Sequence, residues 1–530
     1  MKVLARKSWE ESRLLWRLAL PAILTEVFQF AIAFVTTAFV GHLGDVELAA
    51  VTVVENIFDS SAYGALFAMG SALDTLCGQA AGAGQLDMLG VYTQQSWVVC
   101  GATALALAPA YALAAPILTS LLRQPADVAA AAAPYARWAI PRLFAHAANF
   151  PLQKFFQAQS KVWPVAAISG AALAVHAALT YAAVWRLGYG MRGAAVAGNV
   201  SYWLVTAAQF AYMTRGGFHD AWKGFSARAF QNLGAFVKLS LVSAVMICLE
   251  FWYYTTLLIL VGLLKNAKLQ LDIMSVCLNY EFLTIMVAMG FSTAVGVRVS
   301  NELGASRPKE AKFSVIVAVS TSTVIGAIFM AFVFIWRTSM PKIFSDSQEV
   351  AQGAARLGYL LAATIFMSSI WPVLSGVAVG AGWQVLVAFI NVGCYYLVGI
   401  PLGILFGFRK KHGAQNMGQI FFNPLVSGIL FKFSAGLCDK PFGSSRALQG
   451  IWMGMMTGTL LQMVILFVII IRTKWEKQAV HAVTRISEWG GKNENLPLME
   501  STSMNDQINP ADENICARGT QKNIELMRKD

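Results

Sequence analysis

Charged residues are scarce in this 530-residue chain. Asp, Glu, Lys and Arg make up 13% of it, about half of the roughly 25% found in soluble proteins. A soluble protein of this length would need a charged surface around its core, so a soluble enzyme is excluded. Hydrophobic residues make up 57% of the chain and fall in runs long enough to cross a bilayer. The sequence therefore predicts a polytopic membrane protein of the all-α class.

Several catalytic and binding motifs are missing as well. The seven cysteines form no CxxC pair, which argues against a disulfide framework or a zinc site. The sequence has no GxxxxGKS/T phosphate loop and no HExxH or HxxxxD motif, so nucleotide-driven pumping and membrane-bound catalysis are disfavoured. We expect no cofactor and no metal. The net charge of +12 indicates basic loops beside a membrane rather than nucleic-acid binding.

The hydrophobic runs number twelve, six on each side of a polar connector. A span needs about 20 mostly apolar residues. The predicted spans are residues 16–40, 48–73, 89–113, 130–150, 162–185, 194–213, 238–264, 273–297, 314–336, 357–379, 385–408 and 450–471. The predicted parts of the chain are a cytosolic amino-terminal segment (1–14), an N-lobe of helices 1–6 (15–214), a cytosolic amphipathic connector (215–237), a C-lobe of helices 7–12 (238–473) and a cytosolic, mostly disordered tail (474–530).

Short identities between the two halves share an offset of 220 positions. They are Ala68–Gly70 with Ala288–Gly290, Gly84 with Gly304, and Trp163 with Trp383. Chance identity is the alternative, but the common offset favours two pseudo-symmetric six-helix lobes, an architecture known in transporters. The offset fails after Trp383. We interpret residues 409–448 as an unusual insertion, either dispensable for transport or an artefact of the gene model.

Basic residues are distributed unevenly between the loops. With both termini in the cytosol, the short cytosolic segments up to Lys312 hold fourteen Lys and Arg residues, Lys154 among them, and the opposite loops hold seven. The positive-inside rule therefore predicts cytosolic termini. The vacuolar membrane and the plasma membrane both stay open as locations.

Long motifs stand at the ends of the second and eighth spans and in two further helices. They are Met69–Gln85, Met289–Ala305, Pro151–Gln159 and Pro372–Gly380. These segments resemble signatures of the multidrug and toxic compound extrusion (MATE) family in its plant form, and the resemblance covers residues 15–480 apart from the insertion. It implies two lobes around a central cavity, cation-coupled antiport of organic solutes and a working monomer.

Glycines in these motifs predict close helix packing and unwinding of the helix ends at a gate. The alternative is ordinary packing and turn chemistry. The residues predicted to form hinge or gate loops are Gly78, Gln79, Gly82, Gly84, Asn301, Glu302 and Gly304.

Glu250 stands in the middle of the seventh span, with no basic neighbour in the sequence. A charge in hydrocarbon is costly and is usually functional, and an apolar setting favours the protonated carboxyl. We therefore predict that Glu250 couples transport to protons, although a structural hydrogen-bonding role is the alternative. The resemblance implies the same site, and it places Ser368 where many plant relatives carry a second acid. With one acid the site favours protons over sodium.

Other acidic residues in the spans are secondary candidates. Glu281 lies in the eighth span, and Asp59 and Glu55 are one helical turn apart on one face of the second. Each of the three is a candidate for coupling or for holding helices together. Thr36 stands where many prokaryotic relatives carry an acid, which argues against a cation site in the N-lobe.

Polar and aromatic side chains are predicted to line the cavity. Alternatively, such side chains pack between helices or belong to the aromatic belt at the membrane interface. The candidates are Asn149, Gln153, Gln157, Trp252, Tyr253 and Tyr280.

The function that fits these features is export of organic solutes by a monomer in the bilayer, driven by a proton gradient and using no cofactor. Two alternatives stay open. One is a lipid or oligosaccharide flippase of the same superfamily, which would need a more basic, hydrophilic cavity. The other is a multipass membrane enzyme, which would need a catalytic motif.

Overall fold

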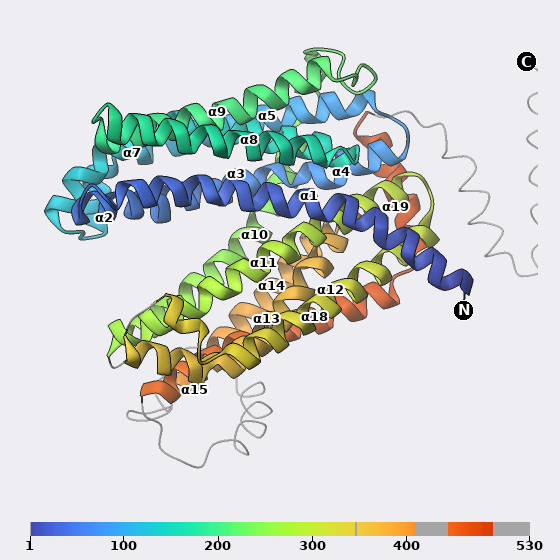
Figure 1. The fold of residues 1–530 in the computed structure, drawn as a ribbon. Helices are drawn as coiled ribbons and strands as arrows, with labels where there is room; N and C mark the ends of the chain where they lie inside the picture. Colours follow the sequence, from blue (N-terminus) through green and yellow to red (C-terminus); the bar gives the residue numbers. More distant parts are fainter. Residues whose placement is uncertain (1, 265, 345–346, 409–443, 491–530) are drawn as a thin grey trace, which may run out of the picture.

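The computed structural model describes residues 2–264, 266–344, 347–408 and 444–490. Within these ranges the regular structure is helical throughout. The helices form two lobes that separate at one end of the molecule and meet at the other (Figure 1). The predicted all-α fold of twelve helices in two lobes is confirmed.

The first six spans form the N-lobe, and several of them are broken. The first span is α1 (Lys2–Val40), and the second combines α2 (Asp45–Val54), the π-helical turn η1 (Glu55–Asp59), α3 (Ser60–Gly70) and α4 (Ala72–Gly82). The others are α5 (Asp87–Ala112) with α6 (Ala114–Pro116) and η2 (Ile117–Leu121), α7 (Ala126–Ala158), α8 (Val162–Tyr181) with η3 (Ala182–Arg186), and α9 (Gly190–Arg215). The connector that follows is largely non-helical, apart from η4 (Ala227–Phe230).

The second six spans form the C-lobe. They are α10 (Leu233–Gly262), α11 (Ala267–Gly304), α12 (Pro308–Trp336) followed by η5 (Met340–Ile343), α13 (Gln348–Ala381), α14 (Gln384–Asn391) continued by η6 (Val392–Gly399) and α15 (Ile400–Phe408), and α18 (Ser444–Arg472). Pro308 begins α12, where a missing backbone N–H has no consequence. Gly382 ends α13 in the left-handed conformation, with φ of 82°, which costs glycine little.

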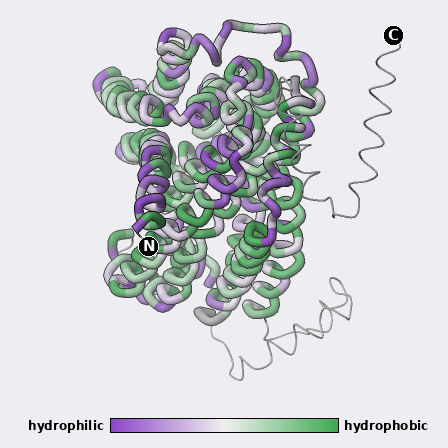
Figure 2. The backbone as a smooth tube through the Cα atoms, turned by 90° about the vertical axis from the view of Figure 1, so that its right-hand side faces the viewer, coloured by the Kyte–Doolittle hydropathy of each residue, from purple (hydrophilic) through white to green (hydrophobic). Residues whose placement is uncertain are grey.

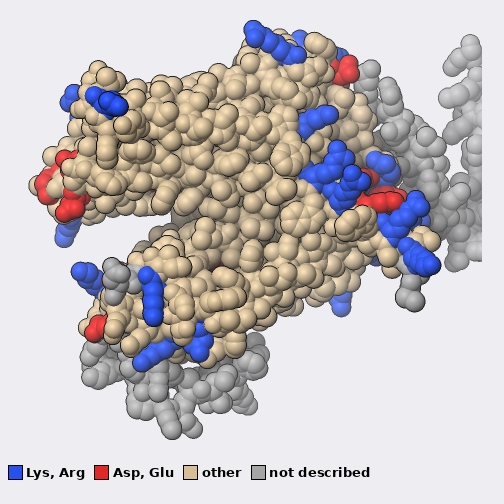
Figure 3. Space-filling view, viewed as in Figure 1, with Lys and Arg blue, Asp and Glu red and all other residues tan. Residues whose placement is uncertain are grey.

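In the described residues, eight continuous helical segments are long and apolar enough to cross a membrane, or nine if the bent pair at 87–121 counts as one span. The remaining spans lie in the N-lobe and carry more polar residues, such as Asp59 in the second and Arg142 in the fourth. Lys, Arg, Asp and Glu gather mainly at the two ends of the molecule and leave a broad uncharged band between them (Figure 3). This band is what a bilayer-spanning surface requires.

Helix α1 is shared between the lobes. Near its amino terminus, Trp16 packs edge-on against Phe291 of α11, with 4.9 Å between the ring centroids. Arg298 of α11 donates to both carboxylate oxygens of Glu11, at 2.9 and 3.0 Å. Farther along, α1 packs against α8 of the N-lobe. The amino-terminal half of α1 therefore ties the lobes together where they meet.

We call the end where α1 begins, and where α4 of the N-lobe contacts α11 and α13 of the C-lobe, the closed end. A further helix, α19 (Trp475–Glu488), lies at this end against α4, α11 and α12. Seen from this end, hydrophilic residues gather on the first turns of α1 and on the neighbouring loops (Figure 2).

Several segment boundaries differ from the sequence predictions. Helix α1 begins at Lys2, so the predicted amino-terminal segment is its first turns. Helix α19 occupies the start of the predicted tail, and Ser444–Leu448, assigned to the insertion, belong to the first turns of α18. Amphipathic helix ends carry charged residues, which hydropathy alone counts as loop. The rest of the insertion and residues 491–530 lie outside the described residues.

Candidate functional site

A cavity of about 270 Å³ lies between the two lobes. Both lobes line it: α3, α4 and α7 contribute one wall, and α10, α11 and α13 the other. Most of the lining is apolar, with aromatic side chains from Phe67, Phe251, Tyr254, Phe282 and Trp371. Four charged residues also line it, Asp74 and Lys154 on the N-lobe wall and Glu250 and Glu281 on the C-lobe wall. Figure 3 shows a deep notch between the lobes at the end opposite the closed end.

Glu250 is held by uncharged partners. Asn391 donates from Nδ2 to Glu250 Oε1 at 3.1 Å, and Gln462 donates from Nε2 to Asn391 Oδ1 at 2.7 Å. Tyr395 donates its hydroxyl to Gln462 and stacks on Tyr253, with 4.3 Å between the ring centroids. A polar chain therefore runs from the cavity into the C-lobe, through α14, η6 and α18. The amide side chains in apolar runs were visible in the sequence, but their link to Glu250 was not.

Ser368 contacts Glu281 rather than Glu250. Its hydroxyl donates to Glu281 Oε1 at 2.9 Å, which joins α13 to α11. Glu281 is buried, with 2% of its surface exposed, and it lines the cavity together with Glu250. The Ser368 hydroxyl, at the position of the usual second acid, therefore bonds to a different cavity acid and not to Glu250. The C-lobe wall keeps two carboxyl groups, and the second one comes from α11.

Lys154 is a cavity residue and not a loop residue. Its Nζ lies 2.9 Å from Asp74 Oδ1 and 5.2 Å from the centre of the Phe67 ring. Only 5% of its surface is exposed. Lys154 was predicted to be a cytosolic loop residue because the fourth span was predicted to end at Phe150, whereas α7 continues to Ala158. The ion pair leaves the N-lobe wall without net charge.

None of the six residues predicted to line the cavity does so. Asn149, Gln153 and Gln157 are buried within the N-lobe. Trp252 is 61% exposed on the outer surface, and Tyr253 is buried in the C-lobe against Tyr395. Tyr280 donates to the carbonyl of Met340 at 2.6 Å. Successive helical residues point about 100° apart, so Phe251 and Tyr254 of this aromatic run line the cavity with Glu250, and Trp252 and Tyr253 do not.

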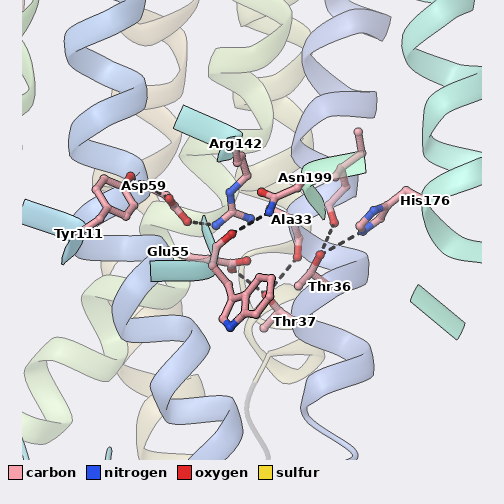
Figure 4. Close-up of polar contacts among 11 residues, drawn as sticks. Ala33, Thr36, Thr37, Glu55, Asp59, Tyr111, Arg142, His176 and Asn199 are labelled. Atoms are coloured by element: carbon pink, nitrogen blue, oxygen red, sulfur yellow. Dashed lines mark hydrogen bonds and ion pairs between the residues drawn. The ribbon is translucent and has the colours of Figure 1, made fainter. Parts of the chain in front are cut away.

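The second acidic pair lies inside the N-lobe, away from the cavity (Figure 4). Asp59 forms an ion pair with Arg142 of α7 and accepts a hydrogen bond from Tyr111 at 2.8 Å. Glu55 accepts one from Thr37 at 2.9 Å. Glu55 begins and Asp59 ends the π-helical turn η1, an irregularity common at functional sites. Here, however, Asp59 already has a buried counter-ion.

Thr36, the residue that argued against a cation site in the N-lobe, contacts a histidine. The Thr36 hydroxyl lies 3.0 Å from His176 Nε2, and His176 Nδ1 lies 2.9 Å from the Ser201 hydroxyl. His176 is fully buried. Hydroxyl groups satisfy both ring nitrogens, as a packing histidine requires. His146 packs among Tyr63, Phe150 and Tyr202.

We expect Asp59→Asn to destabilise the protein rather than change its coupling. The variant leaves the Arg142 charge unpaired in a buried site, which costs about 3–5 kcal/mol of folding free energy. Thermal unfolding of purified protein in detergent measures the loss. The double variant Asp59→Leu/Arg142→Met should recover most of the stability, because it removes both charges. Unchanged stability with lost proton-driven transport would instead assign Asp59 to coupling.

The predicted gate glycines lie in a tight contact between α4 and α11 at the closed end. A Cβ at Gly82 would collide with the backbone oxygen of Asn301, one at Gly304 with the backbone oxygen of Gln79, and one at Gly78 with the hydroxyl of Ser300. These glycines are helical and serve close approach. Gly84, with φ of 75°, is the one in a turn. The expectation of unwound helix ends therefore applies to Gly84 and not to the other three.

Polar side chains add bonds between the lobes at this contact. Asn301 donates to the carbonyl of Ala158 at 3.1 Å. Gln79 donates to the carbonyl of Gly380 at 3.2 Å, and Thr75 donates to the carbonyl of Val379 at 2.5 Å.

Glu302, the remaining predicted gate residue, is bound within the C-lobe. Arg298 lies 2.7 Å and Arg307 lies 2.9 Å from its carboxylate oxygens. The cavity is thus sealed toward α19 by backbone packing, interlobe hydrogen bonds and this charged cluster.

Comparisons with known proteins agree with this architecture. The family model MatE matches the chain twice, at residues 21–182 and 243–405. The chain is 45% identical over 490 residues to Protein DETOXIFICATION 33 of Arabidopsis thaliana, covering 92% of this chain and 94% of that protein. The chain belongs to the MATE family. As a MATE transporter it is not an enzyme. The two family matches start 222 positions apart, in agreement with the offset of 220 positions between identities in the two halves of the sequence.

A second relative of this MATE transporter, Protein DETOXIFICATION 31 of Arabidopsis thaliana, is 43% identical over 495 residues, covering 93% of this chain and 87% of that protein. Among solved structures, the crystal structure of the eukaryotic MATE transporter AtDTX14 has a TM-score of 0.79 and 33% identity, covering 90% of this chain and 99% of that one. The Vibrio cholerae MATE transporter VcmN in its bent form, at 15% identity and a TM-score of 0.72, covers 90% of this chain and 99% of that one and shares the fold.

Proposed function

We propose that this MATE transporter exports organic solutes from the cytosol in exchange for protons, and that the closed end faces the cytosol. The observation that carries the proposal is the pairing of Glu250 and Glu281 on the C-lobe wall of the cavity. In the described part of the chain, neither carboxylate has an ion-pair partner. An intramembrane acid without a counter-ion is most stable when it holds a proton.

Exchange follows from competition for these two carboxyl groups. When the cavity faces an acidic compartment, protons neutralise them and weaken the binding of a solute that uses a carboxylate. When it faces the cytosol, the protons leave and the solute binds. The aromatic lining offers flat apolar surfaces to the body of the solute. Binding in each orientation shifts the equilibrium between the two states, as alternating access requires.

The flippase alternative needs a basic, hydrophilic cavity. Lys154 is the one basic residue among those that line this cavity, and Asp74 neutralises it. The lining is otherwise mainly apolar. These features favour amphipathic organic solutes over the anionic headgroups of lipids. The location in the vacuolar or plasma membrane and action as a monomer belong to the same proposal.

The proposal predicts uphill uptake into acid-loaded proteoliposomes. Three probes cover the charge classes: an aromatic cation, a neutral flavonoid and an aromatic acid. At least one should accumulate in the acidic lumen, and a protonophore should abolish the accumulation. Accumulation that follows a sodium gradient and ignores the protonophore would contradict proton coupling. Scrambling of a fluorescent lipid without solute uptake would favour the flippase.

A further inference from the structure

Helix α19 lies outside the twelve spans but is seated firmly on the C-lobe. Trp383, at the start of α14, donates from Nε1 to Gln478 Oε1 at 2.9 Å, and its ring lies 6.2 Å from that of Trp475. Ala479, Ala482 and Ile486 are buried at successive turns of the same face. These contacts attach α19 to the C-lobe, while Trp489 at its end packs near Tyr92 of the N-lobe.

Arg485 of α19 reaches the N-lobe. Its Nη1 donates to Gln79 Oε1 at 2.9 Å, and Gln79 lies on α4 with none of its surface exposed. Gln79 also donates to the carbonyl of Gly380 on α13. The Gln79 amide is therefore held between two parts of the C-lobe, and both bonds cross the plane where α4 meets α11 and α13.

The fold makes room for the guanidinium. Gly382 has φ of 82°, and a Cβ there would collide with the guanidinium of Arg485. In the described part of the chain Arg485 has no ion-pair partner, and burial lowers its pKa from the ordinary arginine value. A charge held in this way is costly unless its bonds are made. Separation of α4 from the C-lobe would break the bond to Gln79.

We propose that α19 forms part of the gate together with α4 and α11, and that Arg485 holds the closed end shut by binding Gln79. The inference rests on the proposed alternating access, because it says that α19 favours the state in which the closed end is shut. The closed gate is stabilised by a charge-assisted hydrogen bond that is lost when the lobes separate. Truncation of Arg485 would leave Gln79 Oε1 buried without this donor, which destabilises the closed state specifically.

Thiol labelling at Thr75 tests the proposal without any transport measurement. Thr75 is fully buried and donates across the same plane to the carbonyl of Val379. In a Thr75→Cys background, a membrane-impermeant maleimide added at the α19 side should react only when the gate opens. Peptide mass spectrometry reads position 75 separately from Cys77. Arg485→Ala should raise the labelling rate roughly 5- to 100-fold.

Two further variants separate a gate residue from a structural one. Lys477→Ala changes an exposed cation on the same helix and should leave labelling unchanged. Gln79→Ala removes the same bond from the N-lobe side and also the bond to Gly380. In a Gln79→Ala background, Arg485→Ala should therefore add no further effect, because the bond that it breaks is already absent. If Arg485→Ala fails to fold, Arg485→Met tests the bond, because methionine keeps an apolar side chain of similar length but has no donor for Gln79 Oε1.

Unchanged labelling in folded Arg485→Ala, or fully additive effects of the two variants, would overturn the proposal. Failure of proton coupling in the uptake assay would leave the labelling result unaffected, because labelling needs no gradient and no solute. The two inferences therefore fail independently.

Discussion

Glu250→Gln is expected to reduce proton-driven accumulation roughly 5- to 150-fold, the range of a coupling free energy of about 1–3 kcal/mol. The glutamine keeps the size of the acid and an oxygen that can accept from Asn391 Nδ2, as Glu250 does, but it cannot release a proton. Folding should be preserved, because an amide costs no more to bury than a protonated carboxyl. Uptake into acid-loaded proteoliposomes at matched protein amounts measures the effect.

Glu281→Gln is the matched comparison, because Glu281 lines the same cavity and accepts from the Ser368 hydroxyl. If both carboxyl groups carry protons, each variant loses uphill accumulation. If Glu281 only joins α11 to α13, its variant transports almost normally. Downhill exchange of solute should persist in Glu250→Gln, because the binding surfaces stay in place. Full uphill transport by Glu250→Gln would remove Glu250 from the coupling mechanism.

Gly82→Ala is expected to hold the gate open and to stop transport. The added Cβ would collide with the backbone oxygen of Asn301, and backbone atoms on two packed helices cannot move aside easily. Overpacking of this kind costs about 1–3 kcal/mol, and the cost applies only to the state in which α4 and α11 touch. The ratio of closed to open protein should therefore fall roughly 5- to 150-fold. Maleimide labelling at Thr75→Cys and solute uptake measure the two effects.

Gly101→Ala on α5 is the control for Gly82→Ala, because a Cβ there meets nothing within 4 Å. It should leave labelling and uptake unchanged. Gly304→Ala, on the other side of the gate, should reproduce the defect, because its Cβ would collide with the backbone oxygen of Gln79. Normal uptake by Gly82→Ala would show that the close approach of α4 and α11 is not part of the transport cycle.

Amino-acid sequence by itself determined the spans, because hydropathy is local. The predicted run 162–185 became Val162–Arg186, and 385–408 became Gln384–Phe408. Gly82 and Gly304 were also recognisable from their motifs, since only glycine permits such close backbone approach. Predicted boundaries were wrong where a helix continues beyond its apolar run. Helix α7 continues eight residues beyond the predicted end at Phe150, and for this reason Lys154 was misplaced.

Tertiary structure alone decided which polar groups meet. Ser368 and Glu281 lie 87 positions apart, and Arg485 and Gln79 lie 406 apart. Glu250 was recognisable as an acid in an apolar run, but its chain to Asn391 and Gln462 depends on how α10, α14 and α18 pack. The cavity lining also depends on packing, because the rotation of α10 about its axis places Tyr254 in the cavity wall and buries Tyr253 in the C-lobe. Burying a polar group costs energy that only a specific partner offsets, and distant partners are brought together by packing and not by the local sequence.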